Sequence, residues 1–330
     1  MSLPPVEIPL GAMRFNSDSQ KLEYFNGDTW FQIHTFNPDL SGGARGFTAG
    51  GSPGPYSNVI DWYTIPTQGN ASDFGDLTQA RNSAGGCASR TRGVLAGGHN
   101  GSRVNTIDYW THSAQGNATD FGNLLSDKAL NNGMCSNQTR GVSMGTDPSS
   151  DVCQYITIAS TGNAVDFGNT YNGNQAGGAA AATPSRGFLH GGGVPAKLNI
   201  IQYVTIATLG DTQDFGDLPI KVREFGACSN STRSVTYAGD DGSNIKTITK
   251  TELVSKGNGI LFGDCNTTHT GGVAVSSPIR GIVSGGSPGT INTMEYTSLS
   301  TSGDAVDFGD LTNTNTNYTS GTSNAHGGLG

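Results

Sequence analysis

Residues 91–124, TRGVLAGGHNGSRVNTIDYWTHSAQGNATDFGNL, are one copy of a unit that recurs six times in the 330-residue chain. Two anchors inside the unit give the same period of 46 to 48 residues. One is an arginine that is followed by glycine in five copies and by Ser234 in the other, and the second is a phenylalanine in a Phe-Gly pair. The arginines are Arg45, Arg92, Arg140, Arg186, Arg233 and Arg280. The phenylalanines are Phe74, Phe121, Phe167, Phe215, Phe262 and Phe308. Agreement between two anchors indicates a structural repeat.

A repeat of this length, built of short β-rich stretches and Gly-rich turns, is typical of propeller blades. In the second copy the four expected strands cover residues 83–89, 92–98, 105–112 and the segment through Asp-Phe-Gly. We therefore expect an all-β chain in which residues 44–330 form a six-bladed β-propeller. Residues 1–40 lie outside the repeat and read as a β-meander with strands at 11–15, 21–26 and 29–34. Residues 35–43 read as a linker.

The expected third strand alternates apolar and polar residues, as in Ile107 and Asp108. Such a period of two predicts a sheet that is buried on one side. The polar positions of the six copies are Asp61, Asp108, Gln154, Gln202, Thr249 and Glu295.

The two ends of the repeat region complement each other. Residues 319–323 fill the position of a first strand, and the chain then ends before another Arg-Gly strand. The missing second strand is present at residues 45–51. We expect the two ends to share one blade, because this pairing would close the ring and cover two free strand edges.

Composition narrows the function classes. The net charge of −8 and pI near 5.1 argue against a nucleic-acid partner. No apolar run predicts a membrane span, and the N-terminal residues do not read as a signal peptide. The five cysteines occupy small apolar positions of the repeat and are expected to be buried thiols. Without a Cys-x-x-Cys or paired-histidine pattern, neither a metal site nor a cofactor is expected.

No catalytic constellation is visible, so an enzyme is not expected. An arginine present in all six copies is better explained as a structural group that satisfies carbonyls or a carboxylate between blades. The six histidines show no ligand spacing, and His112 shares an apolar position with Ile65 and Ile158. A lyase or glycosidase that uses the propeller axis stays open as an alternative.

Comparison of the copies separates similar turns from divergent loops. The loops between second and third strands and those between fourth and first strands differ from copy to copy, and both sets are expected on one face. Divergent loops on a rigid scaffold often carry binding specificity. The candidate binding residues are Tyr56, His99, Arg103, Tyr171, Lys197, Lys221, Asp240 and Asp241.

The repeat resembles the kelch repeat over residues 44–325. The shared features are a double glycine that ends the second strand, a tyrosine on the third and a large aromatic residue on the fourth. Here phenylalanine stands where kelch repeats usually have tryptophan. The resemblance implies a propeller, and one alternative is a bacterial kelch-like module that binds proteins or carbohydrates.

Residues 11–33, GAMRFNSDSQKLEYFNGDTWFQI, resemble a short module near the ends of many bacteriophage virion and tail-fibre proteins. The Arg-Gly-Val, Gly-Gly and Asp-Phe-Gly repeats also resemble arrays in marine phage structural proteins. These resemblances imply a virion protein, as a tail-fibre, spike or capsid-decoration component. They further imply attachment to other virion proteins through residues 1–40, a homo-oligomer within the particle, and a host surface glycan or protein as partner. An ordinary three-stranded cap is the alternative for residues 1–40.

Overall fold

A computed structural model describes residues 8–16, 21–32, 44–52, 56–145, 147–148, 150–172, 175–193, 196–289, 291–314 and 316–330. The chain divides into two compact units, Met1–Gly43 and Ala44–Gly330. The described residues form 27 strands in seven antiparallel sheets and one short 3-10 helix, η1 (Gly327–Leu329). Within these ranges, no helix has the length and apolar character needed to span a bilayer.

The small unit contains a three-stranded sheet of β1 (Met13–Asn16), β2 (Lys21–Phe25) and β3 (Trp30–Gln32). These strands lie within one or two residues of the expected ones. The side chain of Asn26 accepts hydrogen bonds from the backbone N–H groups of Asp28 and Thr29, which forms the second turn. The expected first turn at residues 17–18, the end of the third strand at 33–34 and the linker at 35–43 lie outside the described residues.

The larger unit contains six four-stranded sheets, numbered here in chain order. Sheet 1 consists of β27 (Ser320–Ser323), β4 (Arg45–Ala49), β5 (Val59–Thr64) and β6 (Ser72–Asp76). Sheet 2 consists of β7 (Gly85–Ala88), β8 (Arg92–Ala96), β9 (Thr106–Thr111) and β10 (Thr119–Asn123). Sheet 3 consists of β11 (Met134–Ser136), β12 (Arg140–Ser143), β13 (Val152–Thr157) and β14 (Val165–Asn169).

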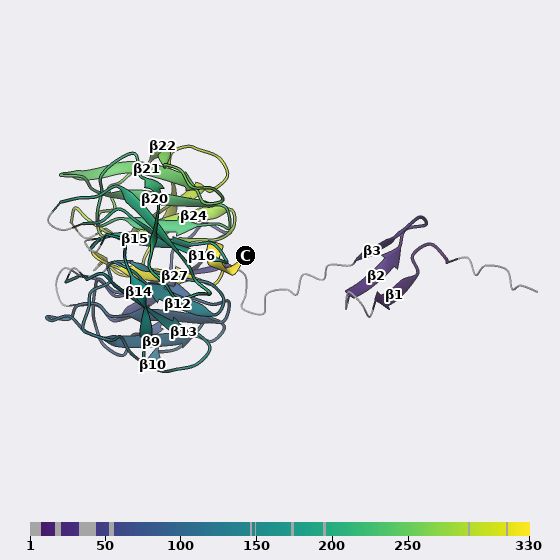
Figure 1. Ribbon diagram of the computed structural model, residues 1–330, viewed down its shortest axis with the longest axis horizontal. Coiled ribbons are helices and arrows are strands. Elements are labelled where there is room, and N and C mark those ends of the chain that lie inside the picture. The colour runs from purple at the N-terminus through teal and green to yellow at the C-terminus, as the bar shows by residue number, and fades with distance from the viewer. Residues whose placement is uncertain are drawn as a thin grey trace, which may run out of the picture. The chain divides into compact units, whose positions relative to one another are not determined.

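The remaining three sheets follow the same order. Sheet 4 consists of β15 (Ala179–Ala182), β16 (Arg186–His190), β17 (Ile200–Thr205) and β18 (Gln213–Asp217). Sheet 5 consists of β19 (Gly226–Ser229), β20 (Arg233–Asp240), β21 (Asn244–Glu252) and β22 (Ile260–Asp264). Sheet 6 consists of β23 (Val273–Ser276), β24 (Arg280–Ser284), β25 (Thr293–Ser298) and β26 (Val306–Asp310) (Figure 1).

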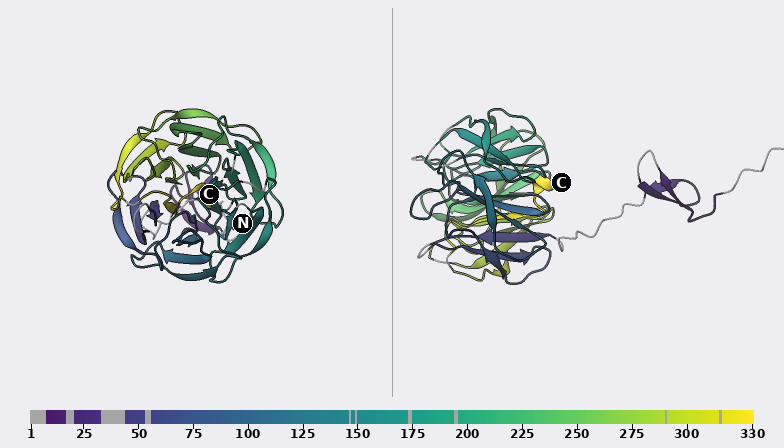
Figure 2. Two further views of the ribbon diagram at one scale, coloured as in Figure 1. Left: turned by 90° about the vertical axis from the view of Figure 1, so that its left-hand side faces the viewer. Right: turned by 90° about the horizontal axis from the view of Figure 1, so that it is seen from below.

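The sheets of the larger unit are arranged radially about a central axis, in a propeller-like arrangement (Figure 2). The first strand of each sheet lies innermost. Neighbouring innermost strands contact one another in the order β7, β11, β15, β19, β23, β27 and again β7. The apolar core consequently lies in layers between adjacent sheets, and each layer draws side chains from two of them. Phe47 and Phe74 of sheet 1, for example, pack with Leu95 and Trp110 of sheet 2.

Sheet 1 joins the two ends of the larger unit. β27 pairs with β4 in antiparallel register, with Ser323 opposite Gly46 and Ser320 opposite Ala49. The backbone N–H of Arg45 also donates to Asn324 Oδ1 over 2.8 Å. The sequence-based expectation that residues from both ends share one sheet agrees with this pairing.

The expectation that the third strands are buried on one side is wrong. The polar positions of these strands are as thoroughly buried as the apolar ones; Asp108 and Gln202, for example, have no exposed surface. The reason is the radial arrangement, because each sheet is covered on both faces by its neighbours. A polar side chain on the second face therefore meets protein instead of water and requires partners there.

Candidate functional site

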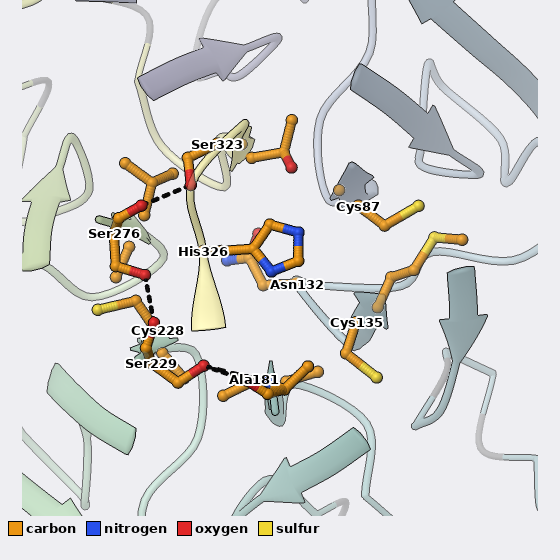
Figure 3. Close-up of a pocket in the computed structure, with 18 of the residues that line it drawn as sticks. Cys87, Asn132, Cys135, Ala181, Cys228, Ser229, Ser276, Ser323 and His326 are labelled. Atoms are coloured by element: carbon orange, nitrogen blue, oxygen red, sulfur yellow. Dashed lines mark hydrogen bonds between the residues drawn. The ribbon is translucent and has the colours of Figure 1, made fainter. Parts of the chain in front are cut away.

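A pocket lies on the central axis among the innermost strands, with space for water of about 60 Å³. Glycine, alanine, serine, cysteine and valine provide most of its lining, and no described Asp, Glu, Lys or Arg contributes. The cysteines Cys87, Cys135 and Cys228 lie around it (Figure 3). Burial raises the pKa of Cys135 and of Cys228 to about 12, so these thiols are protonated at neutral pH and are poor nucleophiles.

Serine hydroxyls join the innermost strands to one another around this pocket. Each serine donates to the backbone carbonyl at the equivalent position of the preceding sheet, over 2.6 to 2.8 Å. The donor and acceptor pairs are Ser136 with Ala88, Ser229 with Ala182, Ser276 with Ser229, and Ser323 with Ser276. These hydroxyls are engaged in holding the sheets together.

The C-terminal turn fills one end of the axis. His326 lies in the pocket (Figure 3), where its Nδ1 accepts from the N–H of Gly328 over 3.1 Å and its Nε2 is 3.1 Å from Ala88 O. Because a carbonyl can only accept, Nε2 carries the proton and the ring is neutral. Burial lowers the pKa of His326 to about 4, which is consistent with a neutral ring at neutral pH.

Tyr318 occupies the other end of the axis. Its hydroxyl donates to Glu224 Oε2 over 3.0 Å, and these two residues line a second, smaller cavity of about 10 Å³. Burial, followed by the charge of Glu224, raises the pKa of Tyr318 to about 12. Side chains therefore occupy both ends of the axis, and the space between them holds only a few water molecules.

The divergent loops share one face of the larger unit, as expected from the sequence. Isolated β-bridges join the two loop sets, as between Asn82 and His99 and between Arg223 and Asp240. The short turns lie at the opposite ends of the strands, and so does the chain's last residue, since Arg90 in such a turn donates to Gly330 O over 3.0 Å.

Four of the candidate binding residues form two pairs on the divergent face. Tyr56 and His99 belong to neighbouring sheets, and the tyrosine hydroxyl is 2.9 Å from His99 Nδ1. Lys197 and Asp240 form an ion pair of 3.1 Å, which Arg223 joins over 3.1 Å. Burial acts to raise the pKa of Asp240, but the N–H of Gly242 and the two cations outweigh it, and the pKa is lowered.

Arg103 pairs with a residue that the sequence comparison did not single out. Its guanidinium contacts both carboxylate oxygens of Asp147, over 2.9 and 3.0 Å, in an exposed position between two divergent loops. The other three candidates stand apart from these groups. Tyr171 is 69% exposed, Lys221 is exposed, and Asp241 accepts from the N–H of Ser243.

The repeat arginines bind the turn of the following sheet. The Nη1 of Arg92, for example, donates to the carbonyls of Ile158 and Ala159, while its guanidinium stacks on Tyr109 at 4.7 Å. Equivalent carbonyl contacts are made by Arg45, Arg140, Arg233 and Arg280. Among described residues, no ion pair joins a repeat arginine to the aspartate of an Asp-Phe-Gly segment.

Buried polar pairs between the divergent loops and the third strands were missed by the sequence analysis. In sheet 2, Arg81 and Asp108 form an ion pair of 3.0 Å with no exposed surface. In sheet 4, Gln202 donates to Gln175 at the corresponding place. The signal in the sequence is a polar residue four positions after Leu77, or five after the equivalent Thr170, that can pair with the polar position of the next third strand.

Sheet 6 has His269 and Glu295 at this place, with Cys265 beside them. The three donor atoms lie within 4.8 Å of one another, and all three residues are buried. The sequence-based expectation of no metal site did not include this group, because its members belong to different elements and follow no familiar spacing. Among the described residues, this is the group of side chains that could hold a metal ion.

Comparison with known proteins gives no relative from which a function could be assigned. No protein-family model matches this chain, and no curated protein matches it.

Proposed function

We propose that residues 44–330 form a six-bladed β-propeller, kelch-like in strand order, whose ring is closed by the pairing of β27 with β4. A contact that repeats between neighbouring sheets supports closure. The N–H of Gly116 in sheet 2 donates to Phe74 O of sheet 1 over 3.0 Å. The same bond joins sheet 1 to sheet 6, from the N–H of Gly69 to Phe308 O, over 2.9 Å.

The propeller would serve as a non-enzymatic structural protein of a phage virion, in a tail fibre, spike or capsid decoration. The axial pocket is the observation that carries the non-enzymatic part. Propeller enzymes need titratable groups at a mouth of the axis that substrate can reach. The described lining of the larger axial pocket lacks charged side chains, and the carboxylate at the other end, that of Glu224, accepts a hydrogen bond from the Tyr318 hydroxyl.

The geometry of the larger unit favours display of the divergent loops. The chain enters this unit at Ala44, whose carbonyl accepts from the N–H of Ile65 beside a short turn of sheet 1. Entry is therefore on the face opposite the divergent loops. Tyr56, Arg103 and Lys197 belong to the divergent loops, where a host surface glycan or protein would bind.

The N-terminal sheet has the surface expected of an attachment module. Met13, Phe15, Leu22, Tyr24 and Phe31 share one face by register, and all are exposed; Phe15 is 66% exposed. An apolar face that is exposed in this way marks a contact site for another protein. We infer that another virion protein or another subunit covers this face.

The test of the virion role is the composition of particles. Virions purified from a culture that carries the gene would be digested and searched by mass spectrometry for peptides of this chain. Peptides in stoichiometric amounts in the particle fraction, lost when residues 1–40 are deleted, would support the proposal. Peptides found solely outside particles would contradict it and leave the kelch-like module as the better description.

Binding to host surfaces is tested separately with a glycan array. The full chain is compared with a variant in which Tyr56, Arg103 and Lys197 are alanine. A glycan bound by the full chain and lost in the variant would support recognition by the divergent face. Equal binding by both proteins would contradict it, and release of sugar products from the array would contradict the non-enzymatic assignment.

A further inference from the structure

The buried group in sheet 6 differs chemically from its equivalents in the other sheets. Cys265 occupies a position that is Leu77, Leu124, Leu218 and Leu311 in four other copies and Thr170 in the fifth. A thiol therefore replaces leucine in the one sheet that also has histidine and glutamate at the polar positions. Cysteine, histidine and glutamate are all ligands that Zn²⁺ takes in proteins.

Hydrogen bonding fixes the tautomer of His269. Its Nδ1 is 2.7 Å from Gly285 O, and a carbonyl only accepts, so Nδ1 carries a proton. In a neutral ring, Nε2 then has a free lone pair. Glu295 Oε1 lies 3.3 Å from this atom, which is within ion-pair distance but without the geometry of a hydrogen bond. Two lone pairs face each other at this place unless a proton or a metal ion lies there.

Glu295 is held in position by the loop that carries the other two residues. Its two carboxylate oxygens accept from the N–H groups of Asn266 and Thr267, over 2.7 and 2.8 Å. Each oxygen has a further lone pair available for a metal. His269 bound to a carbonyl and Glu295 bound to backbone N–H groups have the outer contacts that orient metal ligands.

We propose that Cys265 Sγ, His269 Nε2 and a carboxylate oxygen of Glu295 bind one zinc ion, with a water molecule as fourth ligand. Ligand atoms at about 2.0 to 2.3 Å from a tetrahedral zinc are roughly 3.3 to 3.7 Å apart. The observed 3.3 Å between Nε2 and Oε1 fits this geometry. The site is independent of the proposed virion role and would hold the loop of residues 264–270 to the third strand.

Charge balance favours the divalent ion. A thiolate, a carboxylate and a neutral imidazole carry two negative charges, which Zn²⁺ cancels, and a buried site requires such a balance. A thiol must lose its proton to bind zinc as a thiolate, so metal binding releases that proton to solvent.

The competing interpretation is a simple ion pair. His269 and Glu295 would then correspond to Arg81 and Asp108 of sheet 2, and Cys265 would act as a small apolar residue. The two interpretations differ in whether the thiolate takes part. Cobalt distinguishes them, because Co²⁺ bound to a thiolate gives a near-ultraviolet charge-transfer band in addition to its visible bands.

The experiment uses the full chain, refolded after chelator treatment with Co²⁺ or Zn²⁺, because the group is buried. We expect one Co²⁺ per chain with a thiolate band, displacement of Co²⁺ by Zn²⁺, and a raised Tm. Cys265→Leu, which installs the residue of four other sheets, should abolish the band and weaken metal binding at least 100-fold. Cys153→Ile is the matched control and should keep both.

A second variant keeps the proposal testable if Cys265→Leu does not fold. The double change His269→Arg and Glu295→Asp reproduces the pair in sheet 2 and should fold without binding metal. Failure of the full chain to bind Co²⁺ or Zn²⁺ after refolding would overturn the proposal. Retention of the thiolate band by Cys265→Leu, or of metal binding by the double variant, would overturn it as well.

Discussion

The guanidinium of Arg81 lies 3.0 Å from the carboxylate of Asp108, and neither side chain has any surface in contact with solvent. Arg81 comes from the divergent loop that joins sheet 1 to sheet 2, and Asp108 comes from the third strand of sheet 2. Thr78 completes the group, because its backbone N–H and its hydroxyl both donate to Asp108, over 3.1 and 2.6 Å. The divergent loop is thus fixed to the sheet by a buried charge pair.

Replacement of Arg81 by an apolar residue should lower the free energy of unfolding. Arg81→Leu leaves the carboxylate of Asp108 buried without its counter-ion, so we expect a loss of about 3 to 5 kcal/mol in the free energy of unfolding. Urea denaturation followed by circular dichroism measures this. The control is the double variant with glutamine at both positions, which copies Gln175 and Gln202 of sheet 4 and should recover most of the loss. A single variant as stable as the parent would contradict the assignment.

Deletion of residues 319–330 should prevent stable folding. It removes β27, whose backbone pairs with β4, and the His326 turn that fills the axis. The edge of β4 and the inner surfaces of two sheets would become exposed. Size-exclusion chromatography and thermal melting should show aggregation or loss of a cooperative transition. A truncated protein that melts like the full chain would rule out closure through β27.

Gly141 and Cys87 should be energetically coupled. A β-carbon on Gly141 would lie 2.6 Å from Cys87 Sγ, so Gly141→Ala should cost about 1 to 3 kcal/mol. Adding Cys87→Ala should relieve the clash. The equivalent pair of positions between sheets 4 and 5 has this combination of a larger and a smaller residue. Ser234 stands in place of the glycine in sheet 5, and Ala181 stands in place of the cysteine in sheet 4. A double-mutant cycle by urea denaturation should give a coupling of about 1 kcal/mol or more, and purely additive effects would contradict the packing.

Acid should destabilise the larger unit through buried histidines. Burial lowers the pKa of His112 and of His190 to about 4, below the unfolded value near 6.5. The unfolded chain therefore binds protons first as the pH falls. Their stabilising contribution is complete above pH 6.5 and is lost between pH 6.5 and 4. Each histidine should cost about 2 kcal/mol on going from pH 7 to pH 5.

The matched control for this pH effect is His112→Ile, the residue found at this position as Ile65, Ile158 and Ile206. Urea midpoints measured from pH 7 to pH 4.5 should fall less steeply for the variant than for the parent. Parallel curves would show that His112 does not contribute to the acid sensitivity.

The strands of the larger unit were predicted well because the same residue type recurs at the same position of each copy. Six arginines and six phenylalanines located the strands, and the complementary ends predicted which strands share sheet 1. The burial of the polar face of the third strands was predicted wrongly. Alternation shows which side chains share a face of the strand, but it does not show whether water or a neighbouring sheet covers that face. Radially packed sheets cover both faces, so Asp108 required a buried partner.

The buried pairs could not be predicted with the same certainty. Each pair joins a loop residue to a strand residue some 27 positions later, as Arg81 and Asp108 or Gln175 and Gln202 do. Their contact depends on how far the loop reaches into the next sheet, and loop lengths vary between copies. The Cys265 and His269 positions can be recognised after alignment of the copies, but only the fold brings Glu295 to them.

Hydrogen-bonded Arg45 and Asn324 are 279 residues apart in the chain, which has a consequence for biosynthesis. At roughly 5 to 20 residues per second, the ribosome completes β27 on the order of tens of seconds after β4 emerges. The nascent chain must keep the edge of β4 unpaired during that interval. An unpaired strand edge can pair with another chain, so this interval exposes the protein to aggregation until β27 is made.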